Sequence, residues 1–116
     1  MNVNGFQNLQ KHVSNFIRNS RKTACGPKGV DNISVAAATM MELHCKKEFH
    51  LVDKCCVEHD NCYNCGGKSQ RQCDQKFKQC LIKASGNNQL CTSVGEMFST
   101  AVEKFGKAFF KTNCEL

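Results

Sequence analysis

Ten cysteines in a chain of 116 residues constrain this protein more than any other feature of its sequence. Such a density is typical of a small domain that depends on disulfide bonds because its core is small. The count is even, which predicts five disulfide bonds and an oxidising compartment. We therefore expect one domain over residues 1–116 that is secreted and extracellular.

The chain carries a net charge of +6. A basic surface can meet nucleic acid or an anionic membrane, or it can simply aid solubility. Secretion argues against nucleic acid. No apolar stretch approaches the ~20 residues that would span a bilayer, and the polar first residues show no signal peptide. We interpret the sequence as a mature, soluble protein and expect a monomer with no nucleic-acid partner.

Apolar residues recur at helical spacing, and no segment reads convincingly as a strand. We therefore predict an all-α protein whose first helix covers residues 5–18. Residues 19–30 are polar and contain a loop signal in Cys-Gly-Pro-Lys-Gly. A second helix should run from Asp31, a suitable N-cap residue, to Met41 or His44.

Three later helices are expected. Asp53 should cap a helix that runs to about Tyr63. A capping box at residues 69–72 predicts the start of a helix that runs to about Ala84. A second capping box at residues 93–96 predicts the start of a C-terminal helix. The apolar face of that last helix would contain Val94, Phe98, Ala101, Val102, Phe105 and Phe109.

The spacing of four cysteines predicts how two of these helices pair. Cys55 and Cys62 lie seven residues apart, which is two turns along one helix face, and Cys73 and Cys80 have the same spacing. Two antiparallel helices joined by a short turn can therefore form two rungs, Cys62–Cys73 and Cys55–Cys80. The rungs would be ~10 Å apart on both helices.

The same ladder brings an imidazole and a carboxylate together. His59 lies between the rungs, and Asp74 is expected within ~3 Å of its level along the helix axis. A carboxylate bound to one imidazole nitrogen fixes the tautomer and leaves the other nitrogen free as a base. Asp60 points ~100° away from His59 and could hold a hard cation, which prefers oxygen ligands. A base beside a cation suits attack of water on an ester.

The run Cys55-Cys56-x-x-His59-Asp60-x-Cys62-Tyr63, followed by Cys73-Asp74 and Cys80, resembles the active-site helices of the secreted phospholipases A2. The resemblance covers about residues 25–81. It implies a small disulfide-rich all-α fold with two antiparallel, disulfide-linked central helices. The short connection before Asp74 leaves no room for a β-hairpin, as in some reduced invertebrate members.

The resemblance also implies roles for individual residues. His59 would be the general base, Asp74 would orient it, and Tyr63 would hydrogen-bond to Asp74. Gly26 would supply an oxyanion amide. A further disulfide, Cys25–Cys56, is implied in the same way, while the partners of the remaining four cysteines stay open: Cys45, Cys65, Cys91 and Cys114.

Calcium is the cofactor that the resemblance implies. Asp60 would bind Ca²⁺ together with the backbone carbonyls of Ala24, Gly26 and Gly29. Here the loop is one residue longer than the family pattern, so the third carbonyl stays open between Lys28 and Gly29.

The implied activity is calcium-dependent hydrolysis of the sn-2 ester of glycerophospholipids at a membrane or micelle surface. The net charge and the side of the last helix that carries Lys104, Lys107 and Lys111 favour anionic lipid. The altered loop supports an alternative, a non-catalytic binding or toxin-like protein on the same scaffold. A zinc or redox module, built on Cys62, Cys65, Cys73 and His59, is a third hypothesis.

Overall fold

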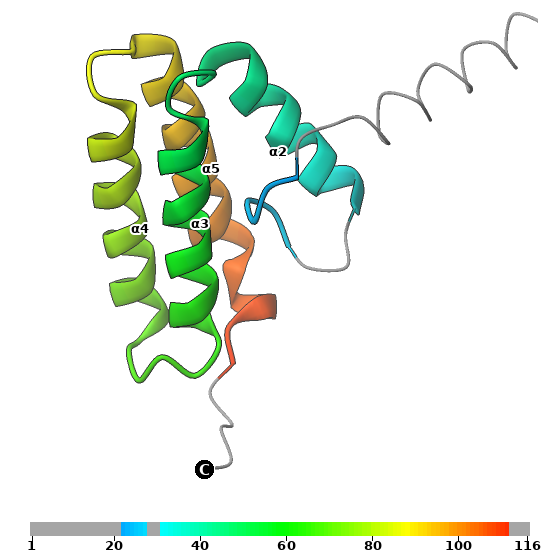
Figure 1. Ribbon diagram of the computed structural model, residues 1–116. Helices are drawn as coiled ribbons and strands as arrows, with labels where there is room; N and C mark the ends of the chain where they lie inside the picture. The colour runs from blue at the N-terminus through cyan, green and yellow to red at the C-terminus, as the bar shows by residue number, and fades with distance from the viewer. Residues whose placement is uncertain (1–21, 28–30, 112–116) are drawn as a thin grey trace, which may run out of the picture.

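The computed structural model describes residues 22–27 and 31–111, and these form a helical domain (Figure 1). The helices are α2 (Asp31–His44), α3 (Phe49–Tyr63), α4 (Gln70–Ser85) and α5 (Gln89–Phe105), followed by the 3₁₀ turn η1 (Gly106–Phe109). Within the described residues the only β pairing is an isolated bridge between Asn64 and Lys111. The all-α prediction is confirmed. The helix predicted over residues 5–18 lies outside the described residues.

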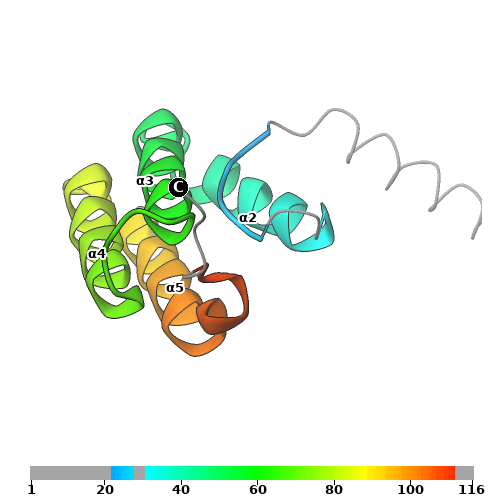
Figure 2. The same ribbon diagram turned by 90° about the horizontal axis from the view of Figure 1, so that it is seen from below.

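The central pair of helices runs antiparallel. Figure 1 shows α3 and α4 side by side with α5 behind them, and Figure 2 shows α2 lying on the other side of α3 from α4. The main packing surfaces join α4 to α3 and to α5. None of the described helices is long and apolar enough to cross a bilayer.

Disulfide bonds replace part of the apolar core. Large side chains that are fully buried are few, among them Met41, Val52, Leu81 and Val94. Half-cystines fill much of the remaining interior between the helices. With few large apolar side chains in the interior, the disulfide bonds supply part of the stability of the fold.

The predicted ladder is confirmed. Cys55–Cys80 and Cys62–Cys73 both join α3 to α4 with Cα atoms 5.7 Å apart. The implied bond Cys25–Cys56 is also present. Of the cysteines left open, Cys45 pairs with Cys91 across 46 residues. Cys65 is also disulfide-bonded, and Cys114 lies outside the described residues. No described cysteine is a free thiol, which argues against the zinc or redox module.

The start of α4 is confirmed and the start of α5 is corrected. Ser69 and Gln72 form the predicted capping box. The box at residues 93–96 is wrong, because α5 begins five residues earlier than that box implies, at Gln89, with Asn88 as its N-cap. Ser93 lies inside the helix and donates a hydrogen bond to the Gln89 carbonyl at 3.2 Å.

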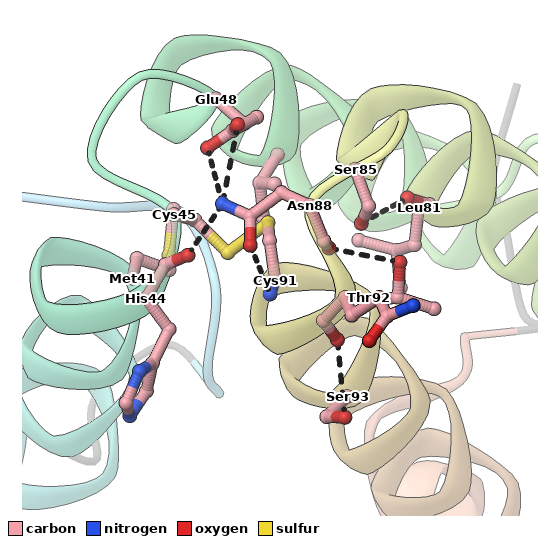
Figure 3. Close-up of a disulfide and its surroundings, with 12 residues drawn as sticks. Met41, His44, Cys45, Glu48, Leu81, Ser85, Asn88, Cys91, Thr92 and Ser93 are labelled. Atoms are coloured by element: carbon pink, nitrogen blue, oxygen red, sulfur yellow. Dashed lines mark hydrogen bonds between the residues drawn. A yellow bond between two sulfur atoms is a disulfide. The ribbon is translucent and has the colours of Figure 1, made fainter.

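Asn88 is a stronger cap because it serves three segments at once (Figure 3). Its Oδ1 accepts a hydrogen bond from the Cys91 amide at 3.2 Å. Its Nδ2 donates to the His44 carbonyl at 2.9 Å and to the Glu48 carboxylate at 3.2 Å. Asn88 thus ties the end of α2 and the start of α3 to the start of α5, beside the Cys45–Cys91 disulfide.

Two further predictions need correction. Helix α3 begins at Phe49, so Asp53 is not its N-cap and is available for another contact. The apolar face predicted for the C-terminal helix is only partly used: Val94 is buried, but Phe105 is 69% exposed and Phe109 is 44% exposed. Helix α5 ends at Phe105, so the apolar spacing no longer points toward the core beyond it.

Candidate active site

The two central helices bring His59 and Asp74 together in the interior. His59 Nε2 lies 2.8 Å from Asp74 Oδ1, and both side chains are buried. They sit between the two disulfide rungs, as the ladder predicts. Because Asp74 occupies Nε2, that nitrogen carries the proton and Nδ1 keeps its lone pair. The pair therefore has the arrangement of a general base supported by a carboxylate.

Tyr63 completes a three-residue group. Its hydroxyl donates to Asp74 Oδ1 at 2.5 Å, the same oxygen that His59 contacts. Its ring lies 4.1 Å from that of His59, and the Phe77 ring lies 4.4 Å from His59. Burial raises the pKa of Tyr63 far above its ordinary value, and its hydrogen bond to Asp74 raises the pKa further. The tyrosine therefore stays a hydrogen-bond donor at neutral pH.

The loop before α2 is held against the helix that carries Asp60, α3. The Thr23 hydroxyl and the Ala24 amide donate to Asp53 Oδ1 at 2.8 and 2.7 Å. One turn further along α3, Cys25 is bonded to Cys56. Asp60 follows Cys56 by another turn on the same helix face. The loop thus runs along α3 in the direction of Asp60.

Gly26 is required at its position for two reasons. Its φ is +106°, which favours glycine, and a Cβ there would lie 3.0 Å from Ser34 Oγ and 3.1 Å from Ser34 Cα. The backbone at Gly26 is therefore shaped by close packing on α2. Gly29 and Lys28, the two candidates for the third calcium carbonyl, lie outside the described residues.

Sequence comparison independently points to one family. The chain is 36% identical to the group XIIA secretory phospholipase A2 of Mus musculus over 63 residues, 46% of this chain and 33% of the mouse protein. It is 53% identical to the Homo sapiens group XIIA protein over 30 residues, 26% of this chain and 16% of that protein. A phospholipase A2-like protein of Caenorhabditis elegans is 27% identical over 74 residues, 63% of this chain and 42% of the nematode protein.

The chain is related to the secreted phospholipases A2. Each match covers less than half of the length of the relative. No family model and no solved structure matches the chain.

The calcium site that the sequence implies would use mostly backbone carbonyl oxygens, and not a cluster of metal-binding side chains. Across residues 22–27 and 31–111 there is no group of three or more His, Cys, Asp or Glu that could hold a metal. The site implied by the sequence instead combines one carboxylate, Asp60, with backbone carbonyls. Those are oxygen donors of the kind that calcium prefers. The residues present therefore fit calcium in their chemistry, and the loop is tied to the helix that carries Asp60 through Asp53 and Cys56.

A cavity of about 370 Å³ opens on the seam between α3 and α4, and His59 forms part of its wall. Both disulfide rungs and Phe77 line it, so much of its surface is apolar. Three charged side chains also face it: Glu58, Lys68 and Lys76. The neighbouring Lys76 side chain lowers the pKa of Lys68, because a second positive charge disfavours the protonated form.

Sequence reasoning missed the segment that supports Tyr63 from the other side. Gly106 is buried, and a Cβ at this position would overlap the Tyr63 hydroxyl oxygen. The Phe110 ring meets Tyr63 edge-on at 5.3 Å, and the Lys111 amide donates to the Tyr63 carbonyl at 3.0 Å. A glycine directly after an apolar helical stripe was the available signal, because such a glycine often marks a close approach.

Proposed function

We propose that this chain is a secreted, calcium-dependent phospholipase A2 that hydrolyses the sn-2 ester of glycerophospholipids. The observation that carries the proposal is the buried contact of 2.8 Å between His59 Nε2 and Asp74 Oδ1. It leaves Nδ1 of His59 as the basic nitrogen. The relationship to the secretory phospholipases A2 supports the choice of reaction.

The chain's own residues divide the proton chemistry among them. His59 Nδ1 takes a proton from the attacking water, and the imidazolium that forms is stabilised by Asp74. Tyr63 holds the Asp74 carboxylate in place through its hydroxyl. When the tetrahedral intermediate collapses, the proton on Nδ1 passes to the oxygen of the leaving lysophospholipid. His59 is then ready for another cycle.

Calcium is the proposed cofactor, bound by Asp60 and the carbonyls of Ala24, Gly26 and Gly29. When bound, the ion would polarise the ester carbonyl and stabilise the oxyanion. The Gly26 amide would be a second donor to that oxygen.

The proposed substrate is phospholipid in a membrane or micelle surface. The net charge of +6 and the exposed lysines of α5 and η1 favour membranes that contain anionic lipid. Lys68 and Lys76 at the mouth of the cavity add positive charge close to His59.

The test is hydrolysis of mixed phosphatidylcholine and phosphatidylglycerol vesicles with and without calcium. His59→Gln should lower the rate by on the order of 10²–10⁴-fold, the usual contribution of a general base. His50→Gln is the matched control, because His50 is an exposed histidine on the same helix and its replacement should leave the rate unchanged. Chelation of calcium should abolish the wild-type rate.

Two results would reject the proposal. Calcium-independent turnover that survives His59→Gln would place the chemistry elsewhere. A folded protein that binds no calcium in calorimetry and hydrolyses no vesicle lipid would favour the non-catalytic alternative.

A further inference from the structure

The proposed hydrolase site leaves one sequence motif unexplained. Asn32-Ile33-Ser34 is an Asn-x-Ser triplet without proline in the middle, the acceptor sequence for N-linked glycosylation. It is the only Asn-x-Ser or Asn-x-Thr triplet in the 116 residues. The triplet supplies no catalytic or calcium-binding group to the proposed site, although Ser34 packs against Gly26, so the acceptor motif itself calls for a separate explanation.

The structure places this triplet where a glycan can be carried. Asn32 is exposed in the first turn of α2, and its neighbour Ile33 is 51% exposed. Ser34 is half-buried and is the residue that Gly26 packs against. Positions two apart on a helix point about 200° from each other. Asn32 therefore projects from the side of α2 opposite to the packed loop.

We propose that Asn32 carries an N-linked glycan. The side-chain Nδ2 would form a bond to C1 of the first sugar of a lipid-pyrophosphate-linked oligosaccharide. The bond between C1 and the pyrophosphate oxygen breaks, the lipid pyrophosphate leaves, and the amide nitrogen gives up one proton. The Ser34 hydroxyl is the recognition element two residues downstream. Transfer occurs on the entering chain before folding, so later packing of Ser34 does not prevent it.

Two features of the fold make the modification compatible with the native state. The disulfides already require an oxidising compartment, in which this modification is also made in animal cells. A sugar on Asn32 also lies beside the exposed Ile33, so it would cover apolar surface rather than displace a packed group. The inference depends on passage through that compartment and does not depend on hydrolase activity.

The experiment is expression of the full chain behind a secretion signal in animal cells. The intact mass of the secreted protein is measured before and after peptide-N-glycosidase treatment. The wild type should lose a glycan-sized mass on treatment, leaving aspartate at position 32. Asn32→Gln and Ser34→Ala should both remove the modification. Ser34→Thr should keep it, because threonine also completes the motif.

A matched control is Asn87→Gln, which changes an exposed asparagine outside any acceptor triplet and should keep the glycan. A secreted wild-type chain of unmodified mass would overturn the proposal. If little protein is secreted, the same masses are compared for the membrane-enclosed protein in the cell lysate. An unmodified chain there would also overturn the proposal. Loss of vesicle hydrolysis in His59→Gln should leave the glycan unchanged, so the two proposals can fail separately.

Discussion

At the scale of single residues, the central feature is one carboxylate oxygen that serves two donors. Asp74 Oδ1 accepts from both His59 and Tyr63, and all three side chains are buried. Buried polar groups are costly unless they are hydrogen-bonded, so the three residues stabilise one another only as a complete set. A disturbance of any one of them is therefore expected to reach the other two.

The alkaline titration of Tyr63 tests this environment. Folding raises its pKa above the ordinary value of 10.0, mainly by burial. In the unfolded chain the phenol ionises from about pH 10, while the folded phenol stays neutral. The stabilising contribution of this group is therefore complete below pH 10 and is lost as the pH rises through the raised pKa. Wild-type protein should lose unfolding free energy above pH 10 relative to Tyr63→Phe.

The measurement is direct because Tyr63 is the only tyrosine and the chain has no tryptophan. The ultraviolet absorbance of tyrosinate in the folded protein reports this residue alone. A transition centred at the ordinary value of 10.0 while the protein remains folded would contradict the buried environment.

A second prediction concerns Gly106. The Cβ of Gly106→Ala would overlap the Tyr63 hydroxyl oxygen, so the phenol must move and its hydrogen bond to Asp74 should lengthen or break. We expect a loss of about 1–3 kcal/mol in unfolding free energy. The Tyr63 pKa should fall toward its ordinary value.

Gly67→Ala is the control for Gly106→Ala. Gly67 has a positive φ, so alanine is strained there, but a Cβ would meet no atom within 4 Å. It should cost stability without moving the tyrosine absorbance. An unchanged Tyr63 titration in folded Gly106→Ala would contradict the proposed support from η1.

At the scale of secondary-structure elements, the junction around Asn88 decides how α2, α3 and α5 meet. An ordinary N-cap satisfies its own helix, whereas Asn88 also uses its amide nitrogen on the end of α2 and on Glu48 (Figure 3). The cap and the inter-helix contacts therefore depend on one side chain.

Replacing Asn88 should cost more than replacing the cap of α4. Ser69→Ala removes an exposed cap and should lower the unfolding free energy by about 1 kcal/mol. Asn88→Ala removes a cap and the donors to His44 and Glu48, so we expect a loss of about 2–3 kcal/mol. Asn88→Asp keeps the capping oxygen but sets a carboxylate beside Glu48. Urea unfolding measures all three, and equal costs for the two alanine variants would contradict the inter-helix role.

At the scale of the whole molecule, the disulfides have two separable effects. Cys45–Cys91 closes 46 residues and joins α2 to α5, whereas Cys62–Cys73 closes only 11 and lies next to Tyr63 and Asp74 in the chain. Cys62 precedes Tyr63 and Cys73 precedes Asp74 in the chain. The longer loop should matter more for stability and the shorter one more for the site.

Paired alanine substitutions test this separation. In the chain-entropy view, loss of Cys45–Cys91 costs about 4 kcal/mol and loss of Cys62–Cys73 about 3 kcal/mol. The two disulfides should rank the other way in their effect on Tyr63, because the Tyr63 pKa should change clearly only when Cys62–Cys73 is removed. A larger shift of the Tyr63 pKa in the variant without Cys45–Cys91 would contradict this. It would show that the packing of α2 on α5, and not the neighbouring Cys62–Cys73 disulfide, positions Tyr63 against Asp74.

Much of the central site follows from local chemistry in the sequence. Two cysteine pairs at the same helical spacing can face each other in one antiparallel register, and that register brings His59 to Asp74. The capping box at Ser69 is also local, because its bonds join residues three apart. Such features depend on fixed helix geometry and were therefore predictable without tertiary structure.

Only the tertiary structure decided the features that join distant segments. Ser93 and Asp53 look like helix caps in isolation. In the folded chain α5 instead begins after Asn88 and α3 begins at Phe49, where Asn88 hydrogen-bonds to Glu48 and to the end of α2. The pairing of Cys45 with Cys91 depends on how α2 meets α5, and the support of Tyr63 by Gly106 depends on where η1 packs. The sequence alone determined that α3 and α4 pair and that His59 meets Asp74 between them, because helical spacing is periodic. Contacts across long separations have no such period, so they appear only when the chain is folded.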